Sequence, residues 1–315
     1  MQYCSLGSTC FRVSRLCFGT LTLGYLGADL PLAQGAALLR EALELGVNFI
    51  DTAQYYANYN YIRRALLAWP GDLVIASKTY ARDDPGIMAA IEEARQVLNR
   101  ERIEIFLLHE EADAQALQAD LPALECLHQA KDKGLIGAVG ISTHSAEAAA
   151  LAARLPEVEV IHPLINQRGI GIIGGGLADM IGALELAKAR GKGVYGMKAI
   201  GGGSLINEAE KHLLWAFSRP YLDAVAIGMR QKSELLTNIA WLMGQDSPEE
   251  KEIRKIPRLL RLEPGNVCTA CGRCAGRCSQ HALIIAEGRL QWQQEKCLLC
   301  GYCIPACPHF YLSIV

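Results

Sequence analysis

The sequence carries little net charge, no long apolar run and no basic, apolar opening segment. Its 31 lysines and arginines nearly balance 33 aspartates and glutamates, which gives a formal net charge of −2. There is therefore no electrostatic reason to expect nucleic acid or an anionic membrane as a partner. No apolar run reaches the roughly 18 residues of a membrane span, and the first residues lack the regions of a secretory signal. We expect a soluble, cytoplasmic protein with no membrane span and no nucleic-acid partner.

The cysteines are unevenly distributed along the chain. Eight of the 12 lie between residues 268 and 307. The other four (Cys4, Cys10, Cys17 and Cys126) share no spacing, and we interpret them as small buried hydrophobic residues. The length of 315 residues and the hydrophobic content of 51% favour a large core and about two domains.

Two cysteine runs with the spacing Cys-x2-Cys-x2-Cys-x3-Cys follow one another near the end of the chain. They are Cys268, Cys271, Cys274 and Cys278, and then Cys297, Cys300, Cys303 and Cys307, the last followed by proline. A thiolate at every third residue can hold three corners of an iron–sulfur cluster. Zinc sites use two cysteine pairs with a longer spacer and need only four ligands. Zinc and unmetallated thiols are the alternatives.

Residues 264–315 resemble the bacterial two-cluster ferredoxins, with one departure, because Ser279 and not proline follows Cys278. In those ferredoxins the fourth cysteine of each run ligates the other cluster. The resemblance therefore implies two [4Fe–4S] clusters that transfer electrons. One is held by Cys268, Cys271, Cys274 and Cys307, and the other by Cys297, Cys300, Cys303 and Cys278. An external redox protein as partner, or a chiefly structural role for the clusters, follows from the same resemblance.

The rest of the chain alternates short apolar runs with longer amphipathic segments. The apolar runs cover residues 16–19, 47–50, 73–76, 103–108, 136–141, 158–161, 193–197 and 224–228. Each is short and mostly Val, Ile or Leu, which is typical of strands buried on both faces. Helical patterns lie between them at 32–45, 85–98, 114–133 and 176–190.

Eight strand–helix units predict an α/β fold, namely a (β/α)8 TIM barrel over residues 1–262, followed by a small α+β ferredoxin-like dicluster domain over 263–315. A doubly wound open sheet is the alternative for the first part. Residues 1–14 predict a hairpin that plugs the bottom of the barrel, and residues 247–262 predict a connecting helix.

Side chains capable of chemistry lie at the ends of three consecutive predicted strands. Asp51 ends the second strand, with Tyr56 five residues further on, Lys78 ends the third strand and His109 ends the fourth. In a barrel of this kind the loops after the strands meet at one rim, where catalytic groups lie. We therefore expect these four side chains to converge. A structural ion pair of Asp51 with Lys78, and a merely structural His109, are the simpler alternatives.

Residues 3 to about 245 resemble the aldo-keto reductase family, through the spacing from Asp51 to Tyr56 and through Lys78 and His109. The resemblance implies a small carbonyl or alcohol substrate, with Tyr56 as proton donor in reduction and acceptor in oxidation. A free phenol has a pKa near 10, and a nearby ammonium such as that of Lys78 lowers it. Asp51 would hold Lys78, and His109 would orient the carbonyl.

The same resemblance implies NADP or NAD as cofactor. The residues it places around the nucleotide are Ser142, Thr143, His162, Asn166, Met197, Lys198, Gly202, Gly203, Arg230 and Asn238. Several depart from the family pattern, since Met197 replaces an aromatic residue and Glu234 stands where a basic or amide side chain is usual. A carboxylate there would repel a 2′-phosphate, so the choice between NADP and NAD, and nucleotide binding itself, stay open.

A literal GxGxxG sequence at residues 169–174 is not a Rossmann fingerprint. That fingerprint needs an acidic residue at the end of the next strand, and here the strand ends in Met197 and Lys198. We interpret the segment as a flexible glycine loop over the barrel mouth.

The leading hypothesis is an aldo-keto-reductase-like oxidoreductase fused to a dicluster module. Hydride transfer moves two electrons whereas a cubane cluster moves one, so the two modules do not couple directly without an intermediary such as a flavin or a substrate radical. The first alternative is a reductase fed through the clusters without NAD(P)H. The second is a non-catalytic electron-transfer or redox-sensing subunit.

Overall fold

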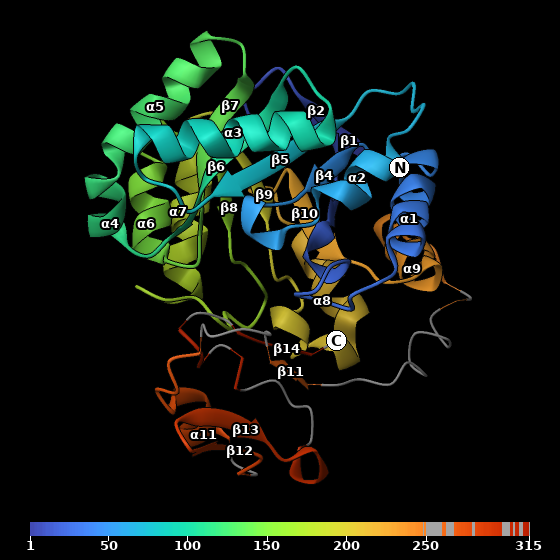
Figure 1. The fold of residues 1–315 in the computed structure, drawn as a ribbon, viewed down its shortest axis with the longest axis vertical. Helices are drawn as coiled ribbons and strands as arrows, with labels where there is room; N and C mark the ends of the chain where they lie inside the picture. Colours follow the sequence, from blue (N-terminus) through green and yellow to red (C-terminus); the bar gives the residue numbers. More distant parts are fainter. Residues whose placement is uncertain are drawn as a thin grey trace.

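The computed structural model describes residues 1–247, 249, 260–262, 268–278, 281–297, 303–304, 306–308 and 311–314. Within these ranges the chain forms a closed eight-stranded barrel and three two-stranded sheets (Figure 1). Most of the connecting helix predicted for residues 247–262 lies outside the described residues, and so does Cys300.

The predicted eight-stranded parallel barrel is confirmed. Its strands are β3 (Leu16–Gly19), β4 (Phe49–Asp51), β5 (Val74–Thr79), β6 (Ile103–Glu111), β7 (Ile136–Thr143), β8 (Val160–Pro163), β9 (Gly193–Gly196) and β10 (Ala224–Gly228). Each strand pairs in parallel with its neighbours, and β10 pairs with β3 to close the barrel. The fold is therefore a (β/α)8 barrel and not an open sheet.

Helices connect the strands and cover the barrel on the outside (Figure 1). They are α1 (Leu32–Glu44), α2 (Tyr59–Ala65), α3 (Asp84–Leu98), α4 (Ala114–Ala119), α5 (Leu121–Asp132), α6 (Ala146–Ala152), α7 (Leu177–Ala189), α8 (Ala209–Phe217) and α9 (Lys232–Leu242). The single helix predicted for residues 114–133 is wrong, because Asp120 separates α4 from α5. Pro122 explains the break, since a proline has no N–H to donate and fits only the first turn of a helix.

An N-terminal hairpin of β1 (Tyr3–Ser5) and β2 (Arg12–Ser14) closes one end of the barrel, as the sequence predicts. Leu6, Phe11 and Val13 pack into the apolar cluster that fills the barrel interior. Gly7 lies against the start of β9, where a Cβ would come within 2.2 Å of the Gly193 nitrogen. The hairpin thus fits this end only with glycine at position 7.

The C-terminal module has a small core of its own. Strand β11 (Leu260–Leu262) pairs antiparallel with β14 (Leu312–Ile314), and β12 (Leu283–Ala286) pairs with β13 (Arg289–Trp292). A short helix, α11 (Arg273–Arg277), precedes β12. The buried residues of this core are Leu260, Cys274, Leu283, Cys303, Ile304, Cys307 and Leu312. The predicted domain boundary after residue 262 stays a prediction. Strand β11, which comes before that boundary, pairs with β14, which comes after it.

The C-terminal module lies at the mouth of the barrel, next to the carboxyl ends of its strands (Figure 1). Strand β14 contacts the 3-10 turn η3 (Gly201–Gly203) that follows β9. Tyr311, just before β14, lines the same pocket as Lys78 and His109. In the described part of the chain, no helix has both the length and the apolarity needed to cross a membrane.

Candidate active site

A buried ion pair lies at the carboxyl ends of β4 and β5. The Lys78 ammonium is 2.9 Å from Oδ2 and 2.8 Å from Oδ1 of Asp51, and it also donates to the Thr52 carbonyl at 2.7 Å. Lys78 is 1% and Asp51 4% exposed. The Tyr195 hydroxyl donates a third bond to Asp51, at 2.9 Å. A buried carboxylate with this many partners can keep its charge and hold Lys78 in one position.

Tyr56 and His109 lie on the open side of this pair. Tyr56 is in the 3-10 turn η2 (Gln54–Tyr56), and the Lys78 ammonium lies 5.1 Å from the centroid of its ring. The rings of Tyr56 and His109 meet edge to face, with centroids 5.8 Å apart. The structure therefore brings together the four side chains that the sequence places at consecutive strand ends.

A bulge at the end of β6 turns two consecutive side chains toward the same pocket. The pairing of β6 with β7 shifts register between Leu108 and Glu111, and Glu110 takes the left-handed conformation with φ 62°. The Glu110 N–H donates to Ser142 Oγ at 2.8 Å, which fixes this turn. In a regular strand neighbouring side chains face opposite ways, whereas here both His109 and Glu110 line the pocket. Bulges re-aim side chains in this manner beside active sites.

His109 is held as a neutral imidazole. Burial, together with the positive charge of Lys78, lowers its pKa well below the usual value. Its Nδ1 is buried and has no hydrogen-bond partner among the described residues. Tyr80 stacks on the imidazole with ring centroids 4.3 Å apart, and the Tyr80 hydroxyl donates to Glu110. A neutral imidazole fixed in this way can hydrogen-bond a carbonyl oxygen.

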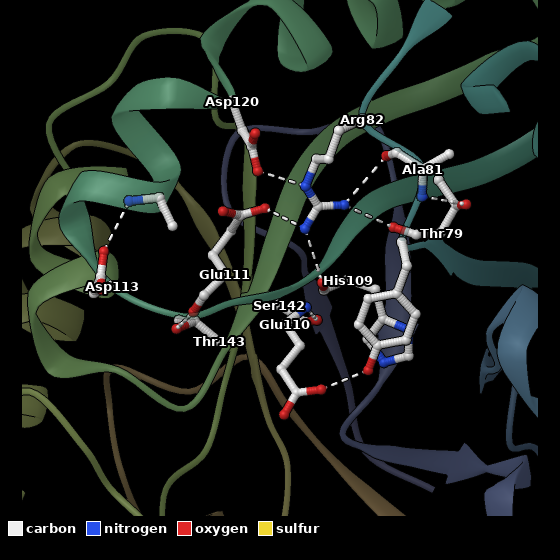
Figure 2. A network of polar contacts seen from close by, with 12 residues as sticks. Thr79, Ala81, Arg82, His109, Glu110, Glu111, Asp113, Asp120, Ser142 and Thr143 are labelled. Carbon is white, nitrogen blue, oxygen red and sulfur yellow. Dashed lines mark hydrogen bonds and ion pairs between the residues drawn. The ribbon is translucent and has the colours of Figure 1, made fainter. Parts of the chain in front are cut away.

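Arg82 joins the ends of β5 and β6 behind this site (Figure 2). Its guanidinium donates to the Glu111 carboxylate at 2.8 Å, to the His109 carbonyl at 3.0 Å and to Asp120. It also donates to the Thr79 carbonyl at 3.2 Å. Arg82 therefore fixes the backbone that carries both Lys78 and His109 without contacting the pocket itself.

We expect Arg82→Met to lower both stability and turnover. Glu111, 1% exposed, would lose its positive partner, at a cost of roughly 1–3 kcal/mol for an unsatisfied buried acceptor. The His109 backbone would lose a fixed contact, so kcat should fall more than KM rises. Thermal unfolding and steady-state kinetics of the variant measure both effects.

The matched control is Lys211→Met, which removes a lysine from an exposed ion pair with Glu208. Exposed pairs contribute little to stability, so this variant should keep the unfolding midpoint and the turnover of the wild type. If the Arg82 and Lys211 variants had the same unfolding midpoint and the same turnover, Arg82 would neither stabilise the fold nor position the site.

Tyr56, Lys78 and His109 line one pocket of about 300 Å³, and Asp51 lies behind Lys78. Aromatic and apolar groups form much of its wall, from Leu21, Tyr55, Tyr56, Tyr80, Met197 and Tyr311. Polar groups of the pocket come from Glu110, His144 and Lys198. Although burial disfavours its charged form, Glu110 has a lowered pKa because the hydrogen bonds from His144 and Tyr80 outweigh burial. A ligand pocket of this size is at the small end of the usual range.

Two predicted nicotinamide contacts use their hydroxyl groups within the protein. Ser142 Oγ accepts from the Glu110 N–H, and Thr143 Oγ1 donates to the Glu111 carbonyl at 2.6 Å. Both residues nevertheless line the pocket.

Two further predicted contacts are used for internal structure. His162 lies inside the barrel, where its Nδ1 bonds to the Tyr195 carbonyl at 2.6 Å and its Nε2 is 3.6 Å from Asp51 Oδ1. Asn166 bonds to the backbone of its own loop, accepting from the Ile170 N–H and donating to the Ile170 carbonyl. Neither residue lines the pocket.

The predicted pyrophosphate turn lies under the C-terminal module. Met197 and Lys198 line the pocket, and Lys198 has a left-handed backbone with φ 57°. Gly203 is buried, and a Cβ placed on Gly202 would come within 3.2 Å of the Ile304 side chain. The surface at which backbone N–H groups would meet a pyrophosphate is thus next to a side chain of the module.

The predicted adenosine-phosphate residues are engaged as well. The Arg230 guanidinium pairs with Glu234 at 2.8 Å, and the Arg230 N–H donates to the same carboxylate at 2.7 Å. Asn238 is buried. Because Arg230 is paired with Glu234 and Ile304 lies beside the glycine turn, a dinucleotide would have to displace both contacts to bind at these residues. The glycine loop of residues 169–174 bonds to the segment that follows β7, where the Ile173 N–H donates to the His144 carbonyl.

Three buried histidines predict a loss of stability in acid. Burial lowers the pKa of His144 and of His162 to about 4 and that of His109 well below its usual value. In the unfolded chain these histidines bind protons as the pH falls below about 6.5, whereas in the folded chain they stay neutral until the pH is much lower. Their contribution to the free energy of unfolding is therefore greatest above pH 6.5 and falls toward pH 4. His162 alone contributes up to roughly 3 kcal/mol. Glu111 opposes this trend, because burial raises its pKa to about 7 and it loses stability as pH rises from about 4.5 to 7.

Comparison of wild type with His162→Gln isolates this effect. Unfolding midpoints measured between pH 8 and pH 4.5 should fall more steeply for the wild type, since acid effects on the rest of the molecule are common to both proteins. Parallel profiles for the two proteins would contradict the assignment.

In the C-terminal module, Cys274 lies near cysteines of both predicted runs. Burial raises the pKa of the Cys274 thiol, and the nearby Cys307 and Cys268 thiols raise it further. Cys274 therefore lies near Cys268 of its own run and near Cys307 of the second run. Backbone N–H groups of Ala282 and Tyr311 donate to the sulfurs of Cys278 and Cys307 at 3.3 and 3.4 Å.

The first predicted ligand set of a [4Fe–4S] cluster stays a prediction, and the position of Cys274 near Cys268 and Cys307 is the observation that bears on it. The second set cannot be completed, since Cys300 lies outside the described residues, while Cys278, Cys297 and Cys303 pack on the same small core. Among the described residues, no three His, Cys, Asp or Glu side chains form a single-ion site.

Sequence reasoning missed several pocket residues. Tyr80 and Glu110 each lie within two residues of a predicted catalytic side chain, so their position after β5 and β6 was an available signal. Tyr195 is in the middle of an apolar strand, and nothing in the sequence marks its bond to Asp51. Tyr311 comes from the other module, where only coordinates could place it at the barrel mouth.

The fold and the pocket define a (β/α)8-barrel protein joined to a cysteine-rich module. The model of the aldo/keto reductase family matches residues 15–214, more than half of the chain, and the chain belongs to this family of oxidoreductases. A model of the 4Fe-4S binding domain matches residues 290–309, which contain the second cysteine run.

Relatives and solved structures agree with this assignment. The chain is 28% identical over 153 residues to L-galactose dehydrogenase of Arabidopsis thaliana, a match that covers 44% of this chain and 48% of that protein. It is 40% identical over 76 residues to pyridoxine 4-dehydrogenase of Escherichia coli K12, covering 22% and 27%. The chain thus spans about half or less of these relatives.

Among solved structures, the holo form of an aldo-keto reductase from Bacillus halodurans superposes with a TM-score of 0.65 at 19% identity, covering 81% of this chain and 96% of that one. The thermostable aldo-keto reductase Tm1743, in complex with the inhibitor epalrestat, gives 0.61 at 20% identity, covering 80% and 98%. At these identities the likeness shows the barrel fold alone.

Proposed function

We propose that the protein interconverts a small carbonyl compound and its alcohol, with Tyr56 as the proton donor and acceptor. The observation that carries this proposal is the meeting of Tyr56, the Asp51–Lys78 pair and His109 at one pocket. Two relatives are dehydrogenases by name, which supports an oxidoreductase function.

Each side chain has a distinct role in this proposal. Reduction of a carbonyl develops negative charge on its oxygen, which a positioned acid must neutralise. Tyr56 gives its hydroxyl proton to that oxygen, and Lys78 places positive charge beside the ring that becomes negative. Asp51 holds Lys78 in position, and the neutral His109 orients the carbonyl by a hydrogen bond. Oxidation of the alcohol uses the same groups in reverse.

The C-terminal module is proposed to hold two [4Fe–4S] clusters, through the crossed ligand sets given above. Such clusters supply electrons one at a time when bound. The proximity of Cys274 to Cys268 and Cys307 supports the first set. An external redox protein is the proposed partner that exchanges electrons with this module.

The source of the reducing equivalents has two candidates. NADP or NAD is the cofactor that the family resemblance implies. Entry of electrons through the C-terminal module, without a nicotinamide, is the second candidate; it requires two successive one-electron transfers and a proton from water to the carbonyl carbon, besides the proton from Tyr56 to the oxygen. The Arg230–Glu234 pair and the position of Ile304 beside Gly202 favour the second.

Anaerobic turnover of the cluster-loaded protein tests the function. Benzaldehyde and glyceraldehyde would be incubated with either reduced methyl viologen or NADPH, and the alcohols measured by chromatography. We expect alcohol above the protein-free control with reduced viologen. Alcohol formed with NADPH alone would show that a nicotinamide is the reductant. No alcohol from any combination would overturn the proposed reaction.

A further inference from the structure

Tyr311 belongs to two sites at once. Its ring lines the pocket together with Tyr56, Lys78 and His109. Its backbone N–H donates to the sulfur of Cys307, one of the predicted cluster ligands, at 3.4 Å. One residue of the C-terminal module therefore reaches both the proposed reaction site and a proposed cluster ligand.

The position of Tyr311 is fixed from both sides. The next residue, Leu312, is 2% exposed, lies in the core of the module and pairs with Leu262 of β11. On the other side, β14 and Ile304 lie against the glycine turn at residues 201–203. Two parts of the module, β14 and Ile304, thus contact this turn of the barrel, which keeps Tyr311 at the pocket.

The composition of the pocket indicates the kind of ligand that Tyr311 would meet. Four tyrosines, at positions 55, 56, 80 and 311, contribute to a pocket of about 300 Å³. Aromatic rings prefer to pack on flat, apolar groups, and a pocket this small admits a compact molecule. The proposed substrate is therefore a compact carbonyl compound with a planar body, with its oxygen toward Tyr56 and His109.

We propose that Tyr311 is a substrate-contacting residue supplied by the C-terminal module, and that its N–H couples occupancy of the pocket to the sulfur of Cys307. This inference rests on the function proposed above for the same pocket. Hydrogen bonds to the sulfurs are among the factors that set the properties of an iron–sulfur cluster. A ligand that contacts the ring shifts the backbone of Tyr311 and thereby the N–H bond to Cys307.

Benzamide is a suitable probe, because it is planar, carries a carbonyl oxygen and is not a substrate for reduction. Its affinity for the full-length, cluster-loaded protein would be measured by calorimetry, with the wild type compared with Tyr311→Ala and Tyr311→Phe. We expect about a tenfold loss of affinity for Tyr311→Ala, the scale of one aromatic contact, and near wild-type affinity for Tyr311→Phe. The control is Ile285→Ala, an exposed residue of β12 outside the pocket.

The coupling has a spectroscopic readout. The electron paramagnetic resonance spectrum of the dithionite-reduced protein should change on addition of benzamide in the wild type, in Tyr311→Phe and in Ile285→Ala, but not in Tyr311→Ala. Iron content of each variant, measured first, shows that the clusters are present.

The outcomes separate this inference from the proposed function. Equal benzamide affinity in wild type and Tyr311→Ala, or no binding by the wild type, would overturn the role of Tyr311. A benzamide-induced spectrum that persists in Tyr311→Ala would overturn the coupling. Failure of the proposed function would appear elsewhere, as a Tyr56→Phe variant with unchanged turnover.

Discussion

Replacement of Tyr56 by phenylalanine should lower kcat for carbonyl reduction by about 10²–10⁴-fold, the usual contribution of a positioned proton donor. The change removes one oxygen and leaves the ring beside Lys78, at 5.1 Å from the ammonium, and beside His109. Because packing of the ring is retained, thermal stability should change little. Turnover with reduced viologen and benzaldehyde measures the loss.

Tyr25→Phe is the matched control for this variant. Tyr25 is an exposed tyrosine whose hydroxyl donates to the Tyr55 carbonyl at 3.4 Å, and it does not line the pocket. Its loss should leave kcat within a factor of two or so, since one exposed hydrogen bond contributes little. A Tyr56→Phe variant as active as Tyr25→Phe would remove Tyr56 from the chemistry.

Replacement of Lys78 by methionine should be the most destabilising single change at the site, and it should also abolish turnover. Asp51 is 4% exposed, and Lys78 is its only oppositely charged lysine or arginine partner in the described part of the chain. Breaking a buried ion pair on one side costs roughly 3–5 kcal/mol, because the remaining charge has lost its partner. The unfolding midpoint and the rate of alcohol formation report the two effects separately.

The double variant Lys78→Met with Asp51→Asn separates stability from chemistry. Asparagine removes the stranded charge and can still accept the bond from Tyr195, so much of the lost stability should return. Turnover should stay lost, since neither side chain can support Tyr56. A Lys78→Met protein that is as stable as the wild type would contradict the buried pair as described.

The barrel and the convergence of Asp51, Tyr56, Lys78 and His109 could be predicted because both depend on local patterns in the chain. Buried parallel strands appear as short apolar runs, and residues at their ends share one rim once the sheet closes. Asp51, Lys78 and His109 follow from that rule alone. The cysteine spacing is likewise local, whereas the crossed assignment of the two runs stays a prediction, for which Cys307 near Cys274 is the relevant contact.

Other features depend on contacts between distant segments or on small backbone irregularities. The bulge in β6 that turns Glu110 into the pocket has no signature in the sequence, and glutamate is not a residue that favours a positive φ. Arg82 joins two loops through contacts that only the folded chain creates. His162 is predicted from the sequence as a nucleotide contact, whereas its ring stacks on Tyr195 inside the barrel, with ring centroids 3.9 Å apart.

The nucleotide residues show where resemblance and structure diverge. The Arg230 guanidinium, predicted as an adenosine-phosphate contact, is held by Glu234 in the first turn of α9. Gly202 keeps the left-handed conformation with φ 64° that a glycine turn requires, yet Ile304 lies against it. Sequence similarity in a barrel can thus preserve the shape of a cofactor turn while another segment of the chain lies over it.

A crystal structure of the cluster-loaded protein with benzamide would test the central claim most directly. The account predicts that the amide oxygen lies within hydrogen-bond distance of the Tyr56 hydroxyl and the His109 imidazole, with the ring of the ligand against Tyr311. Benzamide bound elsewhere, or bound in the pocket with its oxygen turned away from Tyr56, would contradict it.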